Sequence, residues 1–261
     1  MTDVLFSALF IIITAVSGYL LRFLTISGMW AAIFVGLIVF FSLGIDGLLL
    51  MGLFFVSSSI WSKYKRRQKN KIEEMHAKGS QRDVQQVFAN GGMAAIACLI
   101  YIATKDSLWI LVYCSAIACS NSDTWASEIG SLSKDEPVYV RNFKKVSPGT
   151  SGAISFIGTL AAIIGSFFIA VVAYFLFHLS FSNMLSILLF GFLGNVIDTL
   201  FGAFFQVQYI CSQCGLVTEK SLHCGEPTKV KTGYVLFNND MVNFLSSCSS
   251  ALFTFIFYQI S

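Results

Sequence analysis

The sequence predicts an all-α fold, a polytopic membrane helix bundle formed by a single transmembrane domain over residues 1–261. Of its residues, 56% are hydrophobic and only 12% are charged, about half of the charged share of a soluble domain. The charges are also unevenly placed, because residues 146–197 and 241–261 contain no Asp, Glu, Lys or Arg. This composition excludes disordered, collagen-like and disulfide-scaffold proteins.

About eight stretches are apolar enough to cross a bilayer, whose core of about 30 Å needs roughly 20 residues of helix. With Gly, Ser and charged residues as boundaries, we place the spans near residues 4–21, 29–45, 47–62, 85–104, 107–129, 151–177, 184–206 and 240–260. The second and third are short and joined only by Ile45 and Asp46, so one re-entrant hairpin is the alternative. The first is expected to be a span rather than a cleaved signal peptide, because no Lys or Arg precedes it.

The basic residues predict the orientation in the membrane. With the N-terminus outside, every one of the 17 Lys and Arg residues except Lys105 falls in an inward-facing loop, as the positive-inside rule requires. We therefore expect an integral protein of the cytoplasmic (plasma) membrane of a bacterium, with its site facing the cytoplasm and no nucleic-acid partner. Attraction of lipids or nucleotides is the alternative role for these loops.

Four acidic residues fall inside the predicted spans: Asp123, Glu128, Asp198 and Asp240. A charge at a helix centre costs about 2.5–3.5 kcal/mol on insertion scales, so these acids are candidates for function. The predicted topology puts all four toward the cytoplasm, where they can share one catalytic site. Asp123 and Glu128 lie about 140° apart on a regular helix, so either the helix is irregular there or the two acids have different roles.

Small and polar residues form stripes around these acids at helical spacing. The stripes are Gly191, Asn195, Asp198 and Gly202; then Asp240, Asn243 and Ser247; and, more weakly, Gln86, Asn90 and Ala94. Such spacing puts each stripe on one face of its helix. The alternative interpretation is close helix packing with interhelical hydrogen bonds, which small residues favour in lipid.

The loop before the sixth predicted span has the features of an anion site. It contains Arg141, Lys144, Lys145, Ser147, Gly149, Thr150, Ser151 and Gly152. Small residues with available amides at a helix N-terminus, preceded by lysines, favour phosphate. It is not a Walker A motif, because no Gly-Lys-Ser/Thr follows the glycines, and a simple N-cap is the alternative. Carboxylates that bind Mg²⁺ beside such a loop predict phosphoryl transfer.

The seven cysteines divide into two groups. Cys98, Cys114, Cys119 and Cys248 fall in predicted spans and are expected to be small buried apolar residues. The others lie with a histidine in the predicted cytoplasmic loop of residues 207–233, hereafter the Cys/His loop: Cys211, Cys214, His223 and Cys224. This set predicts a structural Zn²⁺ site. The fourth ligand stays open, because adjacent His223 and Cys224 must reach the same ion, and a redox pair is the alternative.

Several motifs together resemble a known membrane family. They are Gln81-Arg82-Asp83 with Gln86 to Gly92, Ser122-Asp123-Thr124-Trp125-Ala126-Ser127-Glu128-Ile129-Gly130, Ser147 to Gly152, Asp198, and Asn239-Asp240 with Asn243. In these positions the chain is similar, from about residue 4 to 255, to the family catalogued as domain of unknown function 92. That family includes transmembrane protein 19 and the plant phytyl-phosphate kinase of vitamin E synthesis.

The resemblance implies phosphorylation of an isoprenyl monophosphate to its diphosphate with a nucleoside triphosphate. A weaker similarity links Asp123, Ala126 and Gly130, followed by Lys145 and residues 149–152, to membrane polyprenol and phytol kinases that use CTP. It favours CTP over ATP. We expect the isoprenyl chain to lie between spans, among the many Phe residues.

The roles expected for the site residues follow from this hypothesis. Asp123, Asp198 and Asp240 would bind Mg²⁺, and Glu128 would orient or complete the metal shell. Lys145 and the amides of residues 149–152 would bind the nucleotide phosphates, and Arg82 the acceptor phosphate. The further polar candidates for nucleotide or phosphate binding are Asn90, Asn121, Lys144, Ser147, Thr150, Ser151, Asn195, Asn239 and Asn243.

Two other classes of function stay open. A transporter or flippase of phosphorylated lipids or small anions would also place acids inside spans, although no inverted repeat is evident in the sequence. A zinc-stabilised assembly protein without catalysis would depend on the Cys/His loop and not on the acids.

Overall fold

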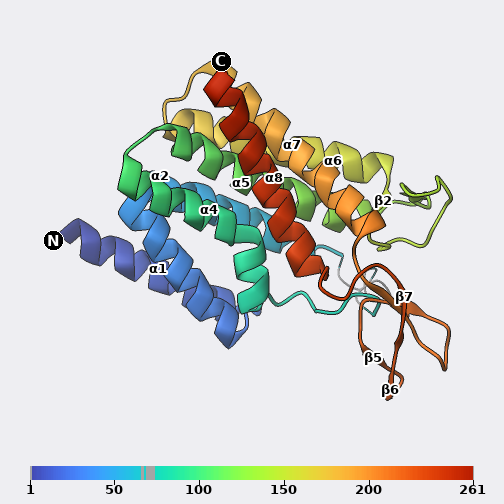
Figure 1. The fold of residues 1–261 in the computed structure, drawn as a ribbon. Coiled ribbons are helices and arrows are strands. Elements are labelled where there is room, and N and C mark those ends of the chain that lie inside the picture. Colours follow the sequence, from blue (N-terminus) through green and yellow to red (C-terminus); the bar gives the residue numbers. More distant parts are fainter. Residues whose placement is uncertain (1, 66–67, 69–73, 261) are drawn as a thin grey trace.

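The computed structural model describes residues 2–65, 68 and 74–260, with side chains from residue 7 onward, and confirms the helix bundle. Its helices are α1 (Thr2–Leu20), α2 (Ile26–Lys63), α4 (Val84–Thr104), α5 (Leu108–Gly130), α6 (Phe156–Leu176), α7 (Phe181–Phe204) and α8 (Asn239–Ile260) (Figure 1). Among the described residues, five helices are long and apolar enough to cross a membrane: α2, α4, α6, α7 and α8. The count of eight spans stays a prediction.

Helix α2 reverses direction at Gly44, whose φ of 65° and ψ of −148° are not helical. A straight helix of this length would separate its ends by about 57 Å. Instead, the Lys63 ammonium at its end donates to the carbonyl of Leu21, just before its start. The two limbs, residues 26–43 and 45–63, are each about 27 Å long and correspond to the second and third predicted spans. The reversal lies at residue 44, so Ile45 and Asp46 belong to the second limb and do not form the connection.

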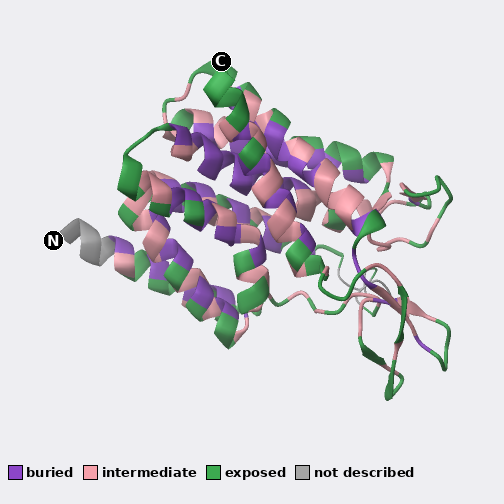
Figure 2. Ribbon diagram, in the orientation of Figure 1, coloured by how far each residue is buried: buried purple, intermediate pink, exposed green. Residues whose placement is uncertain are grey.

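Helix α5 is the centre of the bundle, although it is not among the five helices that are long and apolar enough to cross a membrane. It packs against α2, α4, α6, α7 and α8, and every residue from Leu111 to Ser122 is buried. Figure 2 shows buried residues concentrated in this inner part of the bundle. Glycines on the neighbouring helices permit the close approach: a Cβ added to Gly191 would lie 2.6 Å from the Cβ of Ala118.

Side-chain caps fix where several helices begin. Asp83 and Gln86 form a reciprocal capping box at the start of α4, and Ser155 accepts a hydrogen bond from the Gly158 amide at the start of α6. The predicted sixth span was therefore wrong at its start, since helix begins at Phe156 and not at 151. Residues 149–152 instead form a turn before β2 (Ala153–Ile154), which pairs antiparallel with β1 (Val138–Tyr139).

The Cys/His loop forms small β structures at one end of the bundle (Figure 1). Strand β3 (Gln208–Ile210) pairs with β4 (Val217–Thr218) and β7 (Lys229–Thr232), and β5 (Leu222–His223) pairs with β6 (Glu226–Pro227). The loop joins the segment before α4, because the Glu219 amide donates to the carbonyl of Met75 (2.7 Å). The turn before β2 contacts the residue that precedes the loop, because Ser151 Oγ donates to Gln206 Oε1 (2.6 Å). The basic segments that precede α4, α6 and α8 thus meet at one end.

Candidate active site

A polar cavity of about 370 Å³ opens at this end of the bundle. Its walls come from α4, α5, α7, α8, the segment before α4 and the turn before α6. It brings together most of the predicted site residues: Arg82, Asn90, Asp123, Glu128, Gly149, Thr150, Ser151, Gly152, Asn195, Asp198, Asn239, Asp240 and Asn243. Acids from three helices thus face a single polar space, as the sequence predicted.

Asp123 on α5 and Asp198 on α7 form the acid pair of this cavity, with adjacent carboxyl groups. Asn195 Nδ2 donates to Asp123 Oδ1 (3.2 Å). The Asn243 amide, oriented so that its nitrogen faces both neighbouring acceptors, donates to Asp198 Oδ2 (3.2 Å). Two half-buried carboxylates side by side are costly unless a proton or a cation offsets their repulsion. Their oxygen atoms are the ligand type that Mg²⁺ prefers, so this donor set fits that ion.

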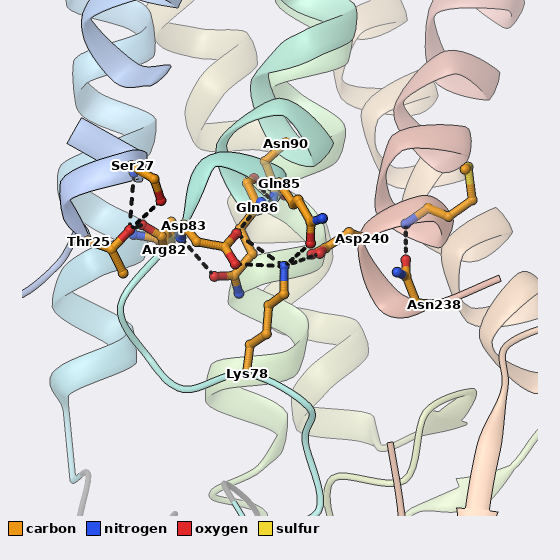
Figure 3. Close-up of polar contacts among 12 residues, drawn as sticks. Thr25, Ser27, Lys78, Arg82, Asp83, Gln85, Gln86, Asn90, Asn238 and Asp240 are labelled. Carbon is orange, nitrogen blue, oxygen red and sulfur yellow. Dashed lines mark hydrogen bonds and ion pairs between the residues drawn. The ribbon is translucent and has the colours of Figure 1, made fainter. Parts of the chain in front are cut away.

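Asp240, at the start of α8, makes an ion pair with Lys78 at 2.5 Å (Figure 3). Lys78 Nζ also contacts Asp83 (2.8 Å) and Gln85 Oε1 (2.7 Å). Partial burial lowers the pKa of Lys78, but the hydrogen bonds to Asp240 and Asp83 outweigh it and raise that pKa above its ordinary value. Lys78 is thus a fixed cation at the cavity wall. Its partner Asp240 was predicted to bind Mg²⁺ with Asp123 and Asp198, and in this structure the Asp240 carboxylate pairs with Lys78.

Glu128 lies away from the acid pair, beside α2, and accepts a hydrogen bond from Ser62 Oγ (2.6 Å). Its charge acts on Arg82: burial lowers the pKa of Arg82, and Glu128 opposes that change. Arg82 Nη1 donates to Ser59 Oγ (2.8 Å). Because α5 is a regular helix here, the difficulty raised by the spacing of Asp123 and Glu128 is resolved: the two acids face different neighbours.

The glycine turn (residues 149–152) lines the same cavity as Lys78. Gly149 and Gly152 have φ of 85° and 77°, a left-handed conformation that glycine adopts readily. At Gly152 an added Cβ would lie 2.4 Å from the backbone of Ala203, so the turn packs directly on the end of α7. The sequence predicted that these residues lie at the first turn of α6. They lie before that helix instead, because Ser155 caps it.

Four predicted site residues lie outside the cavity. Lys144, Lys145 and Ser147 are exposed on the preceding loop and do not line the cavity. Asn121 is fully buried: its Oδ1 accepts from Ser57 (3.1 Å), and its Nδ2 donates to the Gly165 carbonyl (2.8 Å). Asn121 therefore joins α2, α5 and α6 and does not reach the cavity.

The cavity also contains residues that the sequence did not single out as site residues. They are Ser62, His76, Lys78, Gln86, Thr124, Ser127, Ser155, Thr159, Thr199, Glu219 and Asn238. Gln86 had a signal, since it belongs to the weak stripe with Asn90. Lys78 and Glu219 had none, because their places depend on the contact between the Cys/His loop and the segment before α4, where Glu219 Oε2 accepts from the Ala77 amide (3.3 Å).

The Cys/His loop brings Cys211, Cys214, His223 and Cys224 together, with one ligand atom of each within 4.8 Å of the others. Cys224 (φ 54°) and Gly225 (φ 82°) turn the chain, so the adjacent His223 and Cys224 both place a ligand atom in the cluster. The Cys214 amide lowers the pKa of Cys211 to about 6, and the neighbouring Cys214 sulfur raises that of Cys224 to about 11. The donor set fits Zn²⁺.

Comparisons with known proteins place the chain among membrane proteins. The family model described as "Integral membrane protein DUF92" matches residues 9–251. An uncharacterized membrane protein of Methanocaldococcus jannaschii is 32% identical over 71% of this chain and 76% of its own. The Arabidopsis thaliana proteins PGR and VTE6 (chloroplastic) are 28% and 26% identical over 97% and 93% of this chain, and 95% and 68% of theirs. No solved structure matches the chain.

Proposed function

Because the chain belongs to the DUF92 family of integral membrane proteins, we propose that it is a membrane lipid kinase. It transfers the γ-phosphoryl group of a nucleoside triphosphate, CTP in preference to ATP, to an isoprenyl monophosphate. The observation that carries this proposal is the acid pair of Asp123 and Asp198, which faces the same cavity as Lys78, Arg82 and the glycine turn. Carboxylates for a divalent cation and cations for phosphates are the recurring parts of phosphoryl-transfer sites.

The reaction joins an oxygen of the lipid monophosphate to the γ-phosphorus and breaks the bond from that phosphorus to the β–γ bridging oxygen. The nucleoside diphosphate leaves with that oxygen. The attacking oxygen is already anionic, so no general base is needed, and positioning with charge neutralisation carries the rate. Mg²⁺ held by Asp123 and Asp198 would supply neutralisation of the triphosphate.

The lipid monophosphate and the nucleotide phosphates then bind to different groups around the cavity. Lys78 and Arg82 lie on the α4 side of the cavity and bind the lipid monophosphate, and Glu128 orients Arg82 by its charge. The amides of the glycine turn bind the nucleotide phosphates. Lys145, expected from the sequence to bind the nucleotide phosphates, is exposed outside the cavity and has no part in this assignment.

The Cys/His loop holds a structural Zn²⁺ through Cys211, Cys214, His223 and Cys224, and the cavity faces the cytoplasm of a bacterial cell. The zinc proposal rests on the four gathered ligand atoms, and the orientation fits the basic segments at this end of the bundle, since Lys and Arg remain on the cytoplasmic side.

The decisive experiment incubates the purified protein with Mg²⁺, γ-labelled CTP or ATP, and dimethylallyl, geranyl or phytyl monophosphate. We expect labelled isoprenyl diphosphate, formed faster with CTP. No transfer with any pair, together with movement of a lipid monophosphate across liposome membranes that contain the protein, would replace the kinase by a transporter.

A further inference from the structure

An apolar groove of about 460 Å³ lies on the flank of the bundle, between the first limb of α2, α4 and α8. Along α4 its lining recurs on one face at Gln85, Phe88, Gly92, Ala95 and Leu99, a run of about 21 Å at the helical rise. That length exceeds the roughly 15 Å of one bilayer leaflet's hydrocarbon. The groove can therefore hold an extended hydrocarbon chain that enters sideways from the bilayer.

The groove joins the polar cavity at one end. Asn238 and Asp240 line both spaces. At this junction Lys78 Nζ, which faces the polar cavity, contacts Asp240 (2.5 Å) and Gln85 Oε1 (2.7 Å) (Figure 3). An apolar channel that ends at a half-buried cation matches a molecule with a long tail and one anionic head. A nucleotide or free phosphate would leave the apolar part empty.

Small residues keep the groove open. Ala89 and Ala95 are only 4% and 5% exposed and form its floor on α4. A Cβ added to Gly92 would lie 3.2 Å from the Phe244 ring on α8, so larger side chains on this face of α4 would enter the space between the two helices.

We propose that this groove binds the hydrocarbon tail of the lipid monophosphate whose phosphate lies at Lys78. The proposal rests on the kinase function above and deepens it, because it makes the groove the determinant of chain length. A short tail occupies only the end near Gln85, whereas a long tail extends past Ala95 to Leu99.

Groove variants test this position dependence. Ala95→Phe and Leu99→Trp are expected to raise the KM for phytyl monophosphate at least tenfold and to leave that for dimethylallyl monophosphate within twofold. Leu160→Trp on α6 is the matched control for Leu99→Trp, because the two leucines are similarly exposed (47% and 51%) and Leu160 lines neither space. Melting temperatures identify any variant that is merely misfolded. Unchanged phytyl-to-dimethylallyl ratios in both stable groove variants, or an equal change in Leu160→Trp, would overturn the proposal.

A binding measurement separates the groove from the kinase chemistry. Native mass spectrometry of the wild type without nucleotide is expected to show phytyl monophosphate bound at least tenfold more tightly than dimethylallyl monophosphate, with the difference lost in Ala95→Phe. Phosphatidylglycerol is not expected to displace it. Equal binding of long and short monophosphates, or displacement by that bulk phospholipid, would overturn the groove even if phosphoryl transfer occurs. Selective binding without transfer would leave the groove standing and remove the kinase.

Discussion

At the scale of single residues, the acid pair carries the main prediction. Asp123→Asn and Asp198→Asn are each expected to lower phosphoryl transfer at least 100-fold, about 2.7 kcal/mol, because an amide does not replace a carboxylate as a cation ligand. The melting temperature should stay nearly unchanged or rise, since each change removes one of two adjacent half-buried charges. Initial rates and thermal unfolding measure both effects. Asp135→Asn, at an exposed acid outside the cavity, is the control, and full activity of either test variant would remove the metal-ligand role.

Lys78 lines the cavity together with Arg82, and its replacement tests the assignment of the acceptor phosphate. Lys78→Met is expected to raise the KM for the lipid monophosphate at least tenfold, about 1.4 kcal/mol, and Lys144→Met is expected to change it little because Lys144 is exposed outside the cavity. The pKa of Lys78 is raised, so its charge and its contact with Asp240 persist across neutral pH and are lost only above its ordinary pKa. Steady-state kinetics at pH 7 and 9 check this, and an effect of Lys144→Met equal to that of Lys78→Met would contradict it.

The sequence predicted the acid residues of the cavity but not Lys78, the cation that pairs with Asp240, and the reason is physical. Asp123 and Asp198 are detectable because a carboxylate inside an apolar helix is costly and therefore informative. Lys78 lies in a segment with many basic residues, where one more lysine carries no such signal. Asn121 was wrongly placed at the site, because a polar residue near Asp123 on α5 looks the same in sequence whether it faces the cavity or, as observed, Ser57 and Gly165.

At the scale of elements, the glycine turn tests nucleotide binding. Gly149→Val forces a β-branched residue into a φ of 85°, which L-residues rarely adopt, so the turn should distort. We expect Mg²⁺–nucleotide binding to weaken at least tenfold, about 1.4 kcal/mol, in titration calorimetry. Gly52→Val is the control, because nothing lies within 4 Å of an added Cβ there. Unaltered nucleotide affinity in Gly149→Val would remove this turn from the phosphate site.

The Cys/His loop is expected to contain about one zinc ion per chain when the protein is purified without a metal-affinity step. Cys211→Ser should lose the zinc and lower the melting temperature, because structural zinc contributes directly to folding free energy. It should also lower activity, since Glu219 links the loop to Ala77 beside Lys78. Elemental analysis and thermal unfolding measure this, with Cys248→Ser, outside the cluster, as the control. Zinc-free wild type with Cys211, Cys214 and Cys224 all readily alkylated would contradict it.

Element boundaries followed from the sequence where polarity changes sharply. The predicted spans at 85–104, 107–129 and 240–260 agree with α4, α5 and α8 to within one residue at each end. The start of α6 did not follow, because residues 149–155 are small and uncharged and so resemble the helix that comes after them. The reversal within α2 was predicted at Ile45 and Asp46, between two spans or within one re-entrant hairpin, and it lies at Gly44 instead, since glycine adopts the positive φ of this turn readily.

At the scale of the whole molecule, the orientation can be tested with the protein's own thiols. Cys214 and Cys224 are exposed at the Cys/His end, and Lys105 lies in the turn between α4 and α5. In intact bacterial cells a membrane-impermeant thiol reagent is expected to label Lys105→Cys and to leave the wild type unlabelled until the cells are opened and a chelator removes the zinc. In the variant, mass spectrometry then identifies residue 105 as the labelled site. Labelling of the wild type in intact cells would reverse the topology.

The central position of α5 has a consequence for how the chain is assembled. Three consecutive polar residues at its centre find partners on other helices: Asn121 on α2 and α6, Ser122 on α6, and Asp123 on α7. Two of those helices are synthesised after it. Until α6 and α7 emerge, α5 must shelter beside the completed α2 hairpin and α4 or within the insertion machinery, because lipid offers its polar groups nothing to bond. Assembly is therefore complete only when α6 and α7 have packed against this most interior helix. A chain that ends before α7 would leave Asp123 without its partner on that helix and expose it to the cell's membrane quality control.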